Sequence, residues 1–195
     1  GKFILGITGG VGSGKSRVLE ILKEEYGFRV IQADQVAKDL MQPGQESYRA
    51  VVDFLGPSIL NEDGTINRPA MAQVIFGCPD KRVQVDRLTH PLVWNTAFGE
   101  ALACPEPLVV IEAAIPSKEF RDNCGEMWYV YTSRENRMER LKTGRGYTRE
   151  KTLSIMDNQA SDEVFRSFCD SVIDNDKSLE ETRMQIAALM RHISP

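Results

Sequence analysis

Residues 9–16 read GGVGSGKS, and this stretch decides the fold expected of the 195-residue chain. It fits the pattern G-x-x-x-x-G-K-[ST] at every fixed position, which is the phosphate-binding P-loop. An apolar run at residues 3–7 precedes it, and residues 18–22 carry Val, Leu and Ile at helical spacing after it. A strand, a glycine-rich loop and a helix in direct succession are the context that the motif needs, which disfavours a chance match.

Each residue type in this loop has a chemical reason. Glycines let the backbone approach a ligand closely, so that successive N–H groups converge on phosphate oxygens at the positive end of a helix. Lys15 places a charge on the β- and γ-phosphates, and the Ser16 hydroxyl can ligate Mg²⁺. We therefore predict a nucleoside triphosphate site. Its expected residues are Gly10, Val11, Gly12, Ser13, Gly14, Lys15, Ser16 and Arg17.

The rest of the sequence narrows the class of P-loop protein. A GTPase usually carries an N-K-x-D motif that reads the base, and the chain has none. Residues 122–125, DNCG, spell a switch-like D-x-x-G, but they precede an apolar run, so we interpret them as a turn. A motor ATPase is usually larger or assembled. A small chain with one phosphate loop and a helical insertion is typical of a small-molecule kinase.

Short apolar runs alternate with helical patterns along the chain. The runs are rich in β-branched and aromatic residues and are typical of buried parallel strands, which predicts an α/β fold. They lie at residues 3–7, 29–31, 108–111, 127–131 and 171–173. The C-terminal segment adds a capping box, Ser178 and Glu181, followed by an apolar stripe, which predicts a helix that covers the sheet.

The interval from about residue 35 to 105 breaks this alternation, because it contains helical stretches and no convincing strand. Pro91 predicts a kink in the last of these helices. Such an insertion favours a substrate-binding subdomain, with a merely structural excursion as the alternative. We predict a nucleotide-binding core of residues 1–34 and 105–195, and a helical substrate-binding insertion of residues 35–104.

Composition excludes several classes of function. The formal net charge of −4 argues against a nucleic acid partner. The chain has no run of 18 apolar residues and no signal-peptide pattern, so we expect no membrane partner and a cytoplasmic location. The widely spaced Cys78, Cys104, Cys124 and Cys169 indicate reduced, buried thiols, and a zinc site is not expected beside only two histidines.

Two carboxylates follow predicted strands, at the edge of an open α/β sheet where ligands bind. Asp34 can act as the base that accepts the proton of an attacking hydroxyl, or it can cap the helix of residues 35–41. Glu112 can reach Mg²⁺ through water, or it can serve as a cap or an ion-pair partner. Asn175 follows the last predicted strand, near where such kinases pass the adenine.

The segment from Arg134 to Lys151 holds seven basic and three acidic residues, a net charge of +4 in an acidic chain. A basic helical segment with a glycine break indicates a lid that closes over phosphates and neutralises the developing charge. A solvated helix face with pairs four residues apart is the alternative. Arg140 and Arg145 are the best candidates for contacts with the phosphates.

Taken in order, these residues and further short motifs resemble the dephospho-CoA kinase family, over nearly the whole chain. Single motifs such as His-Pro are weak, whereas the ordered set is specific. The matching segments are residues 6–16 (GITGGVGSGKS), 30–34 (VIQAD), 63–68 (DGTINR), 87–91 (RLTHP), 140–141, 145–147 and 158–159.

The resemblance implies a three-layer P-loop kinase core with a parallel sheet, an inserted all-helical CoA subdomain and a helical lid at about residues 134–159. It implies transfer of phosphate from ATP, with Mg²⁺, to the ribose 3′-hydroxyl of dephospho-CoA, the last step of coenzyme A biosynthesis. Asp34 falls on the base, and Lys15 and Ser16 take the phosphate and Mg²⁺ roles. Arg140, with a catalytic role, and Arg145 fall on lid arginines. Arg68 and His90 fall on substrate-domain positions.

The sequence departs from the family pattern at three places. Gln32 replaces the first Asp of a pair, residues 112–116 (EAAIP) replace D-x-P-L-L, and Arg17 replaces a common Thr. Two alternatives therefore stay open: another small-molecule P-loop kinase for a nucleoside, nucleotide or shikimate-like acceptor, and a nucleotide-binding regulatory protein without turnover. We expect a monomer or a weak homo-oligomer.

Overall fold

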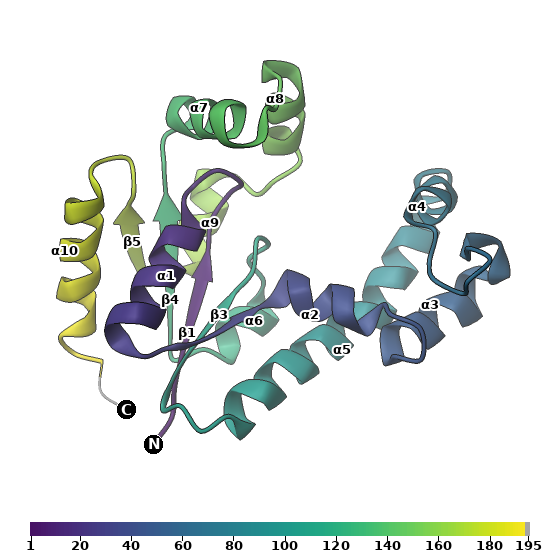
Figure 1. The fold of residues 1–195 in the computed structure, drawn as a ribbon, viewed down its shortest axis with the longest axis horizontal. Coiled ribbons are helices and arrows are strands. Elements are labelled where there is room, and N and C mark those ends of the chain that lie inside the picture. The colour runs from purple at the N-terminus through teal and green to yellow at the C-terminus, as the bar shows by residue number, and fades with distance from the viewer. Residues whose placement is uncertain (194–195) are drawn as a thin grey trace. The chain divides into compact units, whose positions relative to one another are not determined.

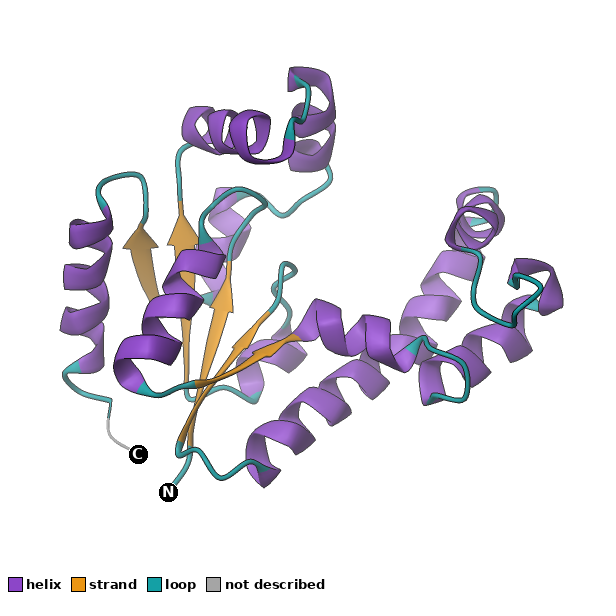
Figure 2. Cartoon of the chain, in the orientation of Figure 1, coloured by secondary structure: helices purple, strands orange, loops and turns teal. Residues whose placement is uncertain are grey.

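The computed structural model describes residues 1–193 and divides into two compact units (Figures 1 and 2). The first, here the sheet unit, comprises Gly1–Ile31 and Ala101–Pro195. The second, here the helical unit, comprises Gln32–Glu100. None of the helices in residues 1–193 combines the length and apolarity that crossing a bilayer requires.

The sheet has five strands in the order β2-β3-β1-β4-β5, which confirms the predicted α/β fold and every predicted strand. β1 is central and pairs in parallel with β3 and β4, and β4 pairs in parallel with β5. The strands are β1 (Phe3–Thr8), β2 (Arg29–Gln32), β3 (Leu108–Glu112), β4 (Glu126–Tyr131) and β5 (Ser171–Asp174). Their carboxyl ends meet at one edge, where a parallel sheet presents its ligand-binding side chains.

Helices cover both faces of the sheet, giving three layers. On one face α1 (Lys15–Tyr26) and α10 (Leu179–Met190) bury an apolar stripe against the strands, with Leu22 and Ile186 fully buried. On the other face are α6 (Lys118–Asp122) and α9 (Asp162–Phe168), where the Phe165 ring stacks on Tyr129 at 4.9 Å between centroids. This sandwich holds β1, and the loop that follows it, on a rigid support.

Two helices follow β4 and form the segment predicted as a lid, α7 (Arg134–Arg145) and α8 (Arg149–Asp157). Figure 1 shows them beyond the carboxyl ends of the strands. The Ser133 hydroxyl caps α7 by accepting from the N–H of Asn136, and Thr148 caps α8 in the same way. Gly146 ends α7 with a φ of 65°, a left-handed conformation that favours glycine.

Within the helical unit, the regular elements of the described residues are helices, joined by turns and loops, with one isolated bridge between Leu60 and Ile66. The sequence likewise predicts helices and no strand here. Val51, Ile59 and Val85 form the centre of its own small core. The last helix runs through Pro91 without interruption. The elements are α2 (Ala33–Leu40), α3 (Glu46–Leu55), the 3-10 turn η1 (Pro57–Ile59), α4 (Arg68–Phe76) and α5 (Pro79–Ala103).

Candidate active site

The glycine-rich loop joins β1 to α1 at the edge of the sheet. Gly12 and Gly14 have φ values of 77° and 89°, a region that side chains disfavour. The N–H of Ser13 donates to the carbonyl of Gly10 at 3.1 Å, which closes the turn. Because Gly14 precedes α1, no capping side chain covers the first N–H groups of that helix, which are therefore available to an anion.

Lys15 sits at the mouth of this loop. Its Nζ donates to the carbonyl of Gly9 at 2.7 Å and lies 3.1 Å from Oε1 of Glu112. Glu112 ends β3 and is only 6% exposed. Of the roles that the sequence allowed for Glu112, the ion pair is therefore the one that this structure contains. The pair holds the lysine ammonium beside the loop.

The Ser13 carbonyl accepts three hydrogen bonds from side chains outside the loop. It accepts from Oγ1 of Thr132 at 2.8 Å, from Nδ2 of Asn175 at 2.9 Å and from Nη1 of Arg140 at 3.2 Å. These three donors come from the ends of β4 and β5 and from α7. One backbone carbonyl thus ties the loop to three elements of the sheet unit.

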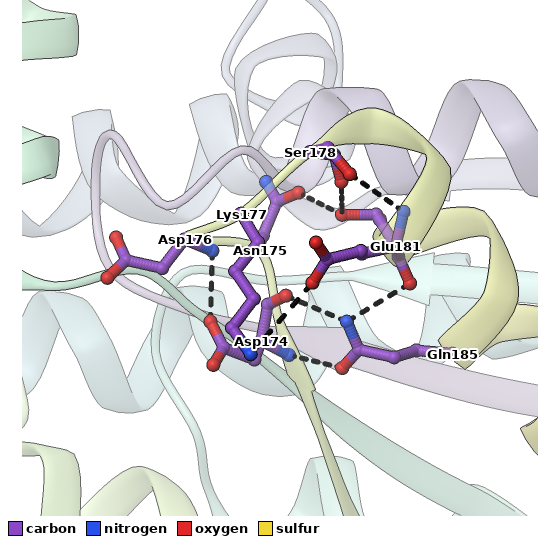
Figure 3. Close-up of polar contacts among 8 residues, drawn as sticks. Asp174, Asn175, Asp176, Lys177, Ser178, Glu181 and Gln185 are labelled. Carbon is purple, nitrogen blue, oxygen red and sulfur yellow. Dashed lines mark hydrogen bonds and ion pairs between the residues drawn. The ribbon is translucent and has the colours of Figure 1, made fainter.

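Asn175 is buried, and both polar atoms of its side chain form hydrogen bonds within the protein. Its Oδ1 accepts from the Thr182 hydroxyl at 2.7 Å, while its Nδ2 donates to Ser13. Figure 3 shows this residue in the turn between β5 and α10, where Gln185 bridges to Asp174 and Ser178 caps α10. The predicted nucleotide contact of Asn175 stays a prediction, and the contacts present make it a support for the loop.

Arg140 faces the loop as well. Besides Ser13, its guanidinium donates to Oγ1 of Thr132 at 3.1 Å and to the carbonyl of Asn175 at 2.7 Å. Burial lowers the pKa of Arg140, and the nearby positive charge of Arg17 acts in the same direction. Arg145, by contrast, is exposed at the end of α7, with its guanidinium carbon 5.9 Å from the centre of the Tyr147 ring. Its phosphate contact stays a prediction.

The segment predicted as a lid is anchored to the rest of the sheet unit at its first residues. The Asp176 carboxylate accepts from the N–H and the hydroxyl of Ser133 and from Nδ2 of Asn136. The hydrogen bond from Asn136, with those from Ser133, holds the pKa of Asp176 below its ordinary value. The start of α7 is therefore fixed beside the turn that also carries Asn175.

The sequence interpretation assigned no individual role to two residues that contact the loop, Arg137 and Gln159. Nε of Arg137 donates to the carbonyl of Val11 at 2.9 Å, and its Nη2 donates to Oε1 of Gln159 at 2.8 Å. The same Gln159 oxygen accepts from the N–H of Val11 at 3.3 Å. Arg137 precedes Arg140 by three residues, so it shares a face of α7, a spacing that could have pointed to it.

Asp34 lies in the first turn of α2 and is exposed. The alternative role of Asp34, a cap for the helix of residues 35–41, is wrong, because β2 ends at Gln32 and α2 begins one residue before Asp34. Gln32 is the N-cap, and its side chain makes no capping hydrogen bond. The Asp34 carboxylate is thus not used in capping, and its role as a base stays a prediction.

Arg68 begins α4, next to the capping residue Asn67. It lines a pocket of about 690 Å³ within the helical unit, whose other walls are mainly Ala, Met, Ile, Phe and Pro side chains. Lys38 and Arg82 also line it, so three exposed cations surround a mostly apolar pocket. His90 lies on α5, 3.6 Å from the carboxylate of Asp86, and is not among the lining residues of this pocket.

Comparison with known proteins identifies similar chains. A model of the dephospho-CoA kinase family matches residues 3–181. The dephospho-CoA kinase of Streptococcus mutans is 34% identical over 193 residues, covering 97% of each chain. That of Carboxydothermus hydrogenoformans is 34% identical over 197 residues, covering 96% of this chain and 93% of the relative.

Solved structures share the fold over the full length. A Thermus thermophilus crystal structure aligns with a TM-score of 0.83 at 25% identity, covering 100% of this chain and 99% of that one. Two others show likeness of fold alone. Dephospho-CoA kinase from Campylobacter jejuni has a TM-score of 0.71 at 18% identity, covering 100% and 98%. Shikimate kinase from Acinetobacter baumannii has a TM-score of 0.55 at 16% identity, covering 99% of this chain and 96% of that one. The three-layer P-loop kinase core is therefore confirmed.

Proposed function

The chain belongs to the dephospho-CoA kinase family, and from this premise we propose that it transfers the γ-phosphoryl group of ATP to the ribose 3′-hydroxyl of dephospho-CoA. The observation that carries the proposal is the phosphate loop between β1 and α1, with uncapped N–H groups and Lys15 at its mouth. A site of this kind binds and orients a polyphosphate, and positioning supplies most of the catalysis of phosphoryl transfer.

The donor side uses residues of the sheet unit. The N–H groups at the start of α1 receive the phosphates, and Lys15 moves its ammonium from Glu112 to the β- and γ-phosphates. The Arg140 guanidinium lies against the loop through Ser13 and neutralises charge that develops during transfer. The predicted nucleotide site also includes Gly10, Val11, Gly12 and Arg17 of the loop. Arg145 and Asn175, which lie outside the loop, are its remaining predicted members.

Mg²⁺ fits the residues present. The Ser16 side chain is exposed at the start of α1, beside Lys15, and a hydroxyl oxygen is a ligand type that Mg²⁺ accepts. When bound, the ion neutralises charge on the phosphate oxygens and helps to orient them. Ser16 would hold it directly.

Asp34 is the proposed base. Its carboxylate takes the proton of the 3′-hydroxyl as that oxygen forms its bond to the γ-phosphorus. The bond between the γ-phosphorus and the bridging oxygen breaks, and ADP leaves with the electron pair. The exposure of Asp34 in the first turn of α2, free of any capping role, supports this assignment.

The pocket of the helical unit suits the acceptor. Dephospho-CoA combines a diphosphate with a long, weakly polar arm, so a mostly apolar pocket ringed by Lys38, Arg68 and Arg82 offers both kinds of contact. His90 remains a further candidate for acceptor binding. This assignment deepens the predicted role of the insertion at residues 35–104.

We also infer that the protein acts in the cytoplasm, as a monomer or a weak homo-oligomer without a nucleic acid partner. The net charge of −4 disfavours a nucleic acid partner, and four free thiols are typical of a reducing compartment. Gel filtration with light scattering measures the oligomeric state directly.

The test is one assay. The purified protein is mixed with Mg-ATP and dephospho-CoA, ADP release is followed, and the product is weighed by mass spectrometry. We expect coenzyme A, with little ADP released when the acceptor is omitted. Product from a nucleoside or from shikimate instead would assign another acceptor, and ATP binding without product from any acceptor would favour the regulatory alternative.

A further inference from the structure

Two hydrogen-bond donors converge on one neutral oxygen at the mouth of the phosphate loop. The N–H of Val11 and Nη2 of Arg137 both donate to Oε1 of Gln159, at 3.3 and 2.8 Å. Nε of Arg137 also donates to the carbonyl of Val11 at 2.9 Å, which fixes the guanidinium against the loop. Gln159 follows α8, so its amide oxygen reaches the loop from the far end of the lid.

This arrangement leaves a positive charge without a negative partner. Both oxygens that Arg137 contacts are neutral, and within residues 1–193 no carboxylate forms a salt bridge with it. Burial is the main cause that lowers the pKa of Arg137, and the positive charge of Arg134 adds to it. An anionic oxygen is a better acceptor than a neutral amide for both donors.

Gly10 provides the space for this contact. A Cβ atom placed on Gly10 would lie 2.2 Å from Nη2 of Arg137 and 2.9 Å from Oε1 of Gln159. Gly10 is not among the glycines with a positive φ, so its backbone conformation does not require glycine. Any side chain here would push both groups away from the loop.

We propose that the N–H of Val11 and the guanidinium of Arg137 form a subsite for an oxygen of the terminal phosphoryl group of ATP, and that Gln159 occupies this subsite in the nucleotide-free protein. Val11 lies four residues before Lys15, away from the first N–H groups of α1 that receive the inner phosphates. The oxygen bound there is therefore an outer one. ATP displaces the Gln159 oxygen, whereas ADP lacks the terminal group and leaves it in place.

The subsite rests on the proposed binding of ATP, but it does not depend on the acceptor. Its test is calorimetric titration of Mg-ATP and Mg-ADP into the full chain without acceptor, in the parent, Arg137→Met and Gln159→Leu. We expect Arg137→Met to weaken ATP binding about tenfold or more and ADP binding about twofold or less. Gln159→Leu removes the competing oxygen, and we expect ATP to bind about threefold tighter or more, with ADP unchanged.

Arg183→Met is the control, because Arg183 is exposed on α10 and lies 3.1 Å from the carboxylate of Glu25. It should change neither affinity. Equal weakening of ATP and ADP by Arg137→Met would overturn the proposal and make Arg137 a support for the loop only. Weaker ATP binding by Gln159→Leu would overturn the displacement of Gln159. If Arg137→Met does not fold, Arg137→Lys takes its place with the same expected direction.

The outcomes separate this inference from the proposed function. If Arg137→Met weakens the binding of ATP more than that of ADP, but the parent phosphorylates an acceptor other than dephospho-CoA, the subsite is supported and the proposed function is contradicted. If the parent makes coenzyme A and Arg137→Met weakens the binding of ATP and ADP equally, the proposed function is supported and the subsite is contradicted.

Discussion

The phosphate loop and the pocket of the helical unit are built in opposite ways. The carbonyl of one loop residue, Ser13, accepts three side-chain hydrogen bonds. One of the three donors is the buried Asn175 amide, whose oxygen in turn accepts from the Thr182 hydroxyl. The pocket has mostly apolar walls, and its cations, Lys38, Arg68 and Arg82, are all exposed.

This difference agrees with the role that we propose for each region. A transferred phosphoryl group needs hydrogen-bond donors that are already oriented, because reorienting them during the reaction would raise its activation free energy. A long, flexible acceptor can be held instead by apolar contact and by exposed charges such as those that line the pocket. The loop is therefore predicted to be sensitive to single polar changes, and the pocket to respond gradually.

The largest expected effect is that of Asp34→Asn, which keeps the shape of the side chain but removes the base. We expect kcat to fall by about a hundredfold or more while ATP binding is unchanged, since the loop is untouched. Steady-state kinetics and calorimetry measure the two quantities. Asp39→Asn, at an exposed position of the same helix, is the control. Unchanged turnover in Asp34→Asn would remove Asp34 from the mechanism.

Asn175→Ala tests how much the loop depends on its buried support. The change removes one donor from Ser13 and the nearer acceptor of the Thr182 hydroxyl, which keeps only the Ser178 carbonyl at 3.3 Å. We therefore expect the free energy of unfolding to fall by about 2 kcal/mol and the KM for ATP to rise. Denaturant unfolding gives the first value. Asn123→Ala, whose amide is exposed, should change little. Equal stability of Asn175→Ala and the parent would show that the loop keeps its shape unaided.

The pocket is tested by the double change Arg68→Gln and Arg82→Gln. We expect the KM for dephospho-CoA to rise about tenfold, which is about 1.4 kcal/mol of binding, with the KM for ATP unchanged. The matched control is Arg87→Gln, an exposed arginine on α5 outside the pocket lining. A rise in the KM for ATP instead would assign these arginines to the donor.

The smallest effect is expected from Gln32→Asp. It supplies a capping carboxylate at the start of α2, where the present side chain makes no capping bond, and should stabilise the fold by about 1 kcal/mol. Gln45→Asp is the matched variant, because Gln45 is the uncapped N-cap of α3. Both should raise the urea midpoint alike. A change in kcat confined to Gln32→Asp would report a second carboxylate beside the base.

Local signals in the sequence predict the elements of this fold, but not which side chains contact one another across it. The strands, the helical insertion and the lid follow from periodicity and turn residues, which are local signals. The helix predicted to begin at residue 35 begins two residues earlier, at Ala33, because β2 ends at Gln32 and α2 follows it directly. Arg137 and Gln159 were visible only as members of a basic segment and of a short motif, since their function depends on the loop that they contact.

By itself, the sequence determined the phosphate loop, because the glycine torsions, the consecutive N–H groups and Lys15 are all encoded within eight neighbouring residues. Only the tertiary structure decided which side chains hold that loop. Arg137 lies 126 residues from Val11 along the chain, and Asn175 lies 162 residues from Ser13. Such contacts arise from the packing of β4, β5 and α7 around β1, and no local pattern of residues specifies which side chains that packing brings together.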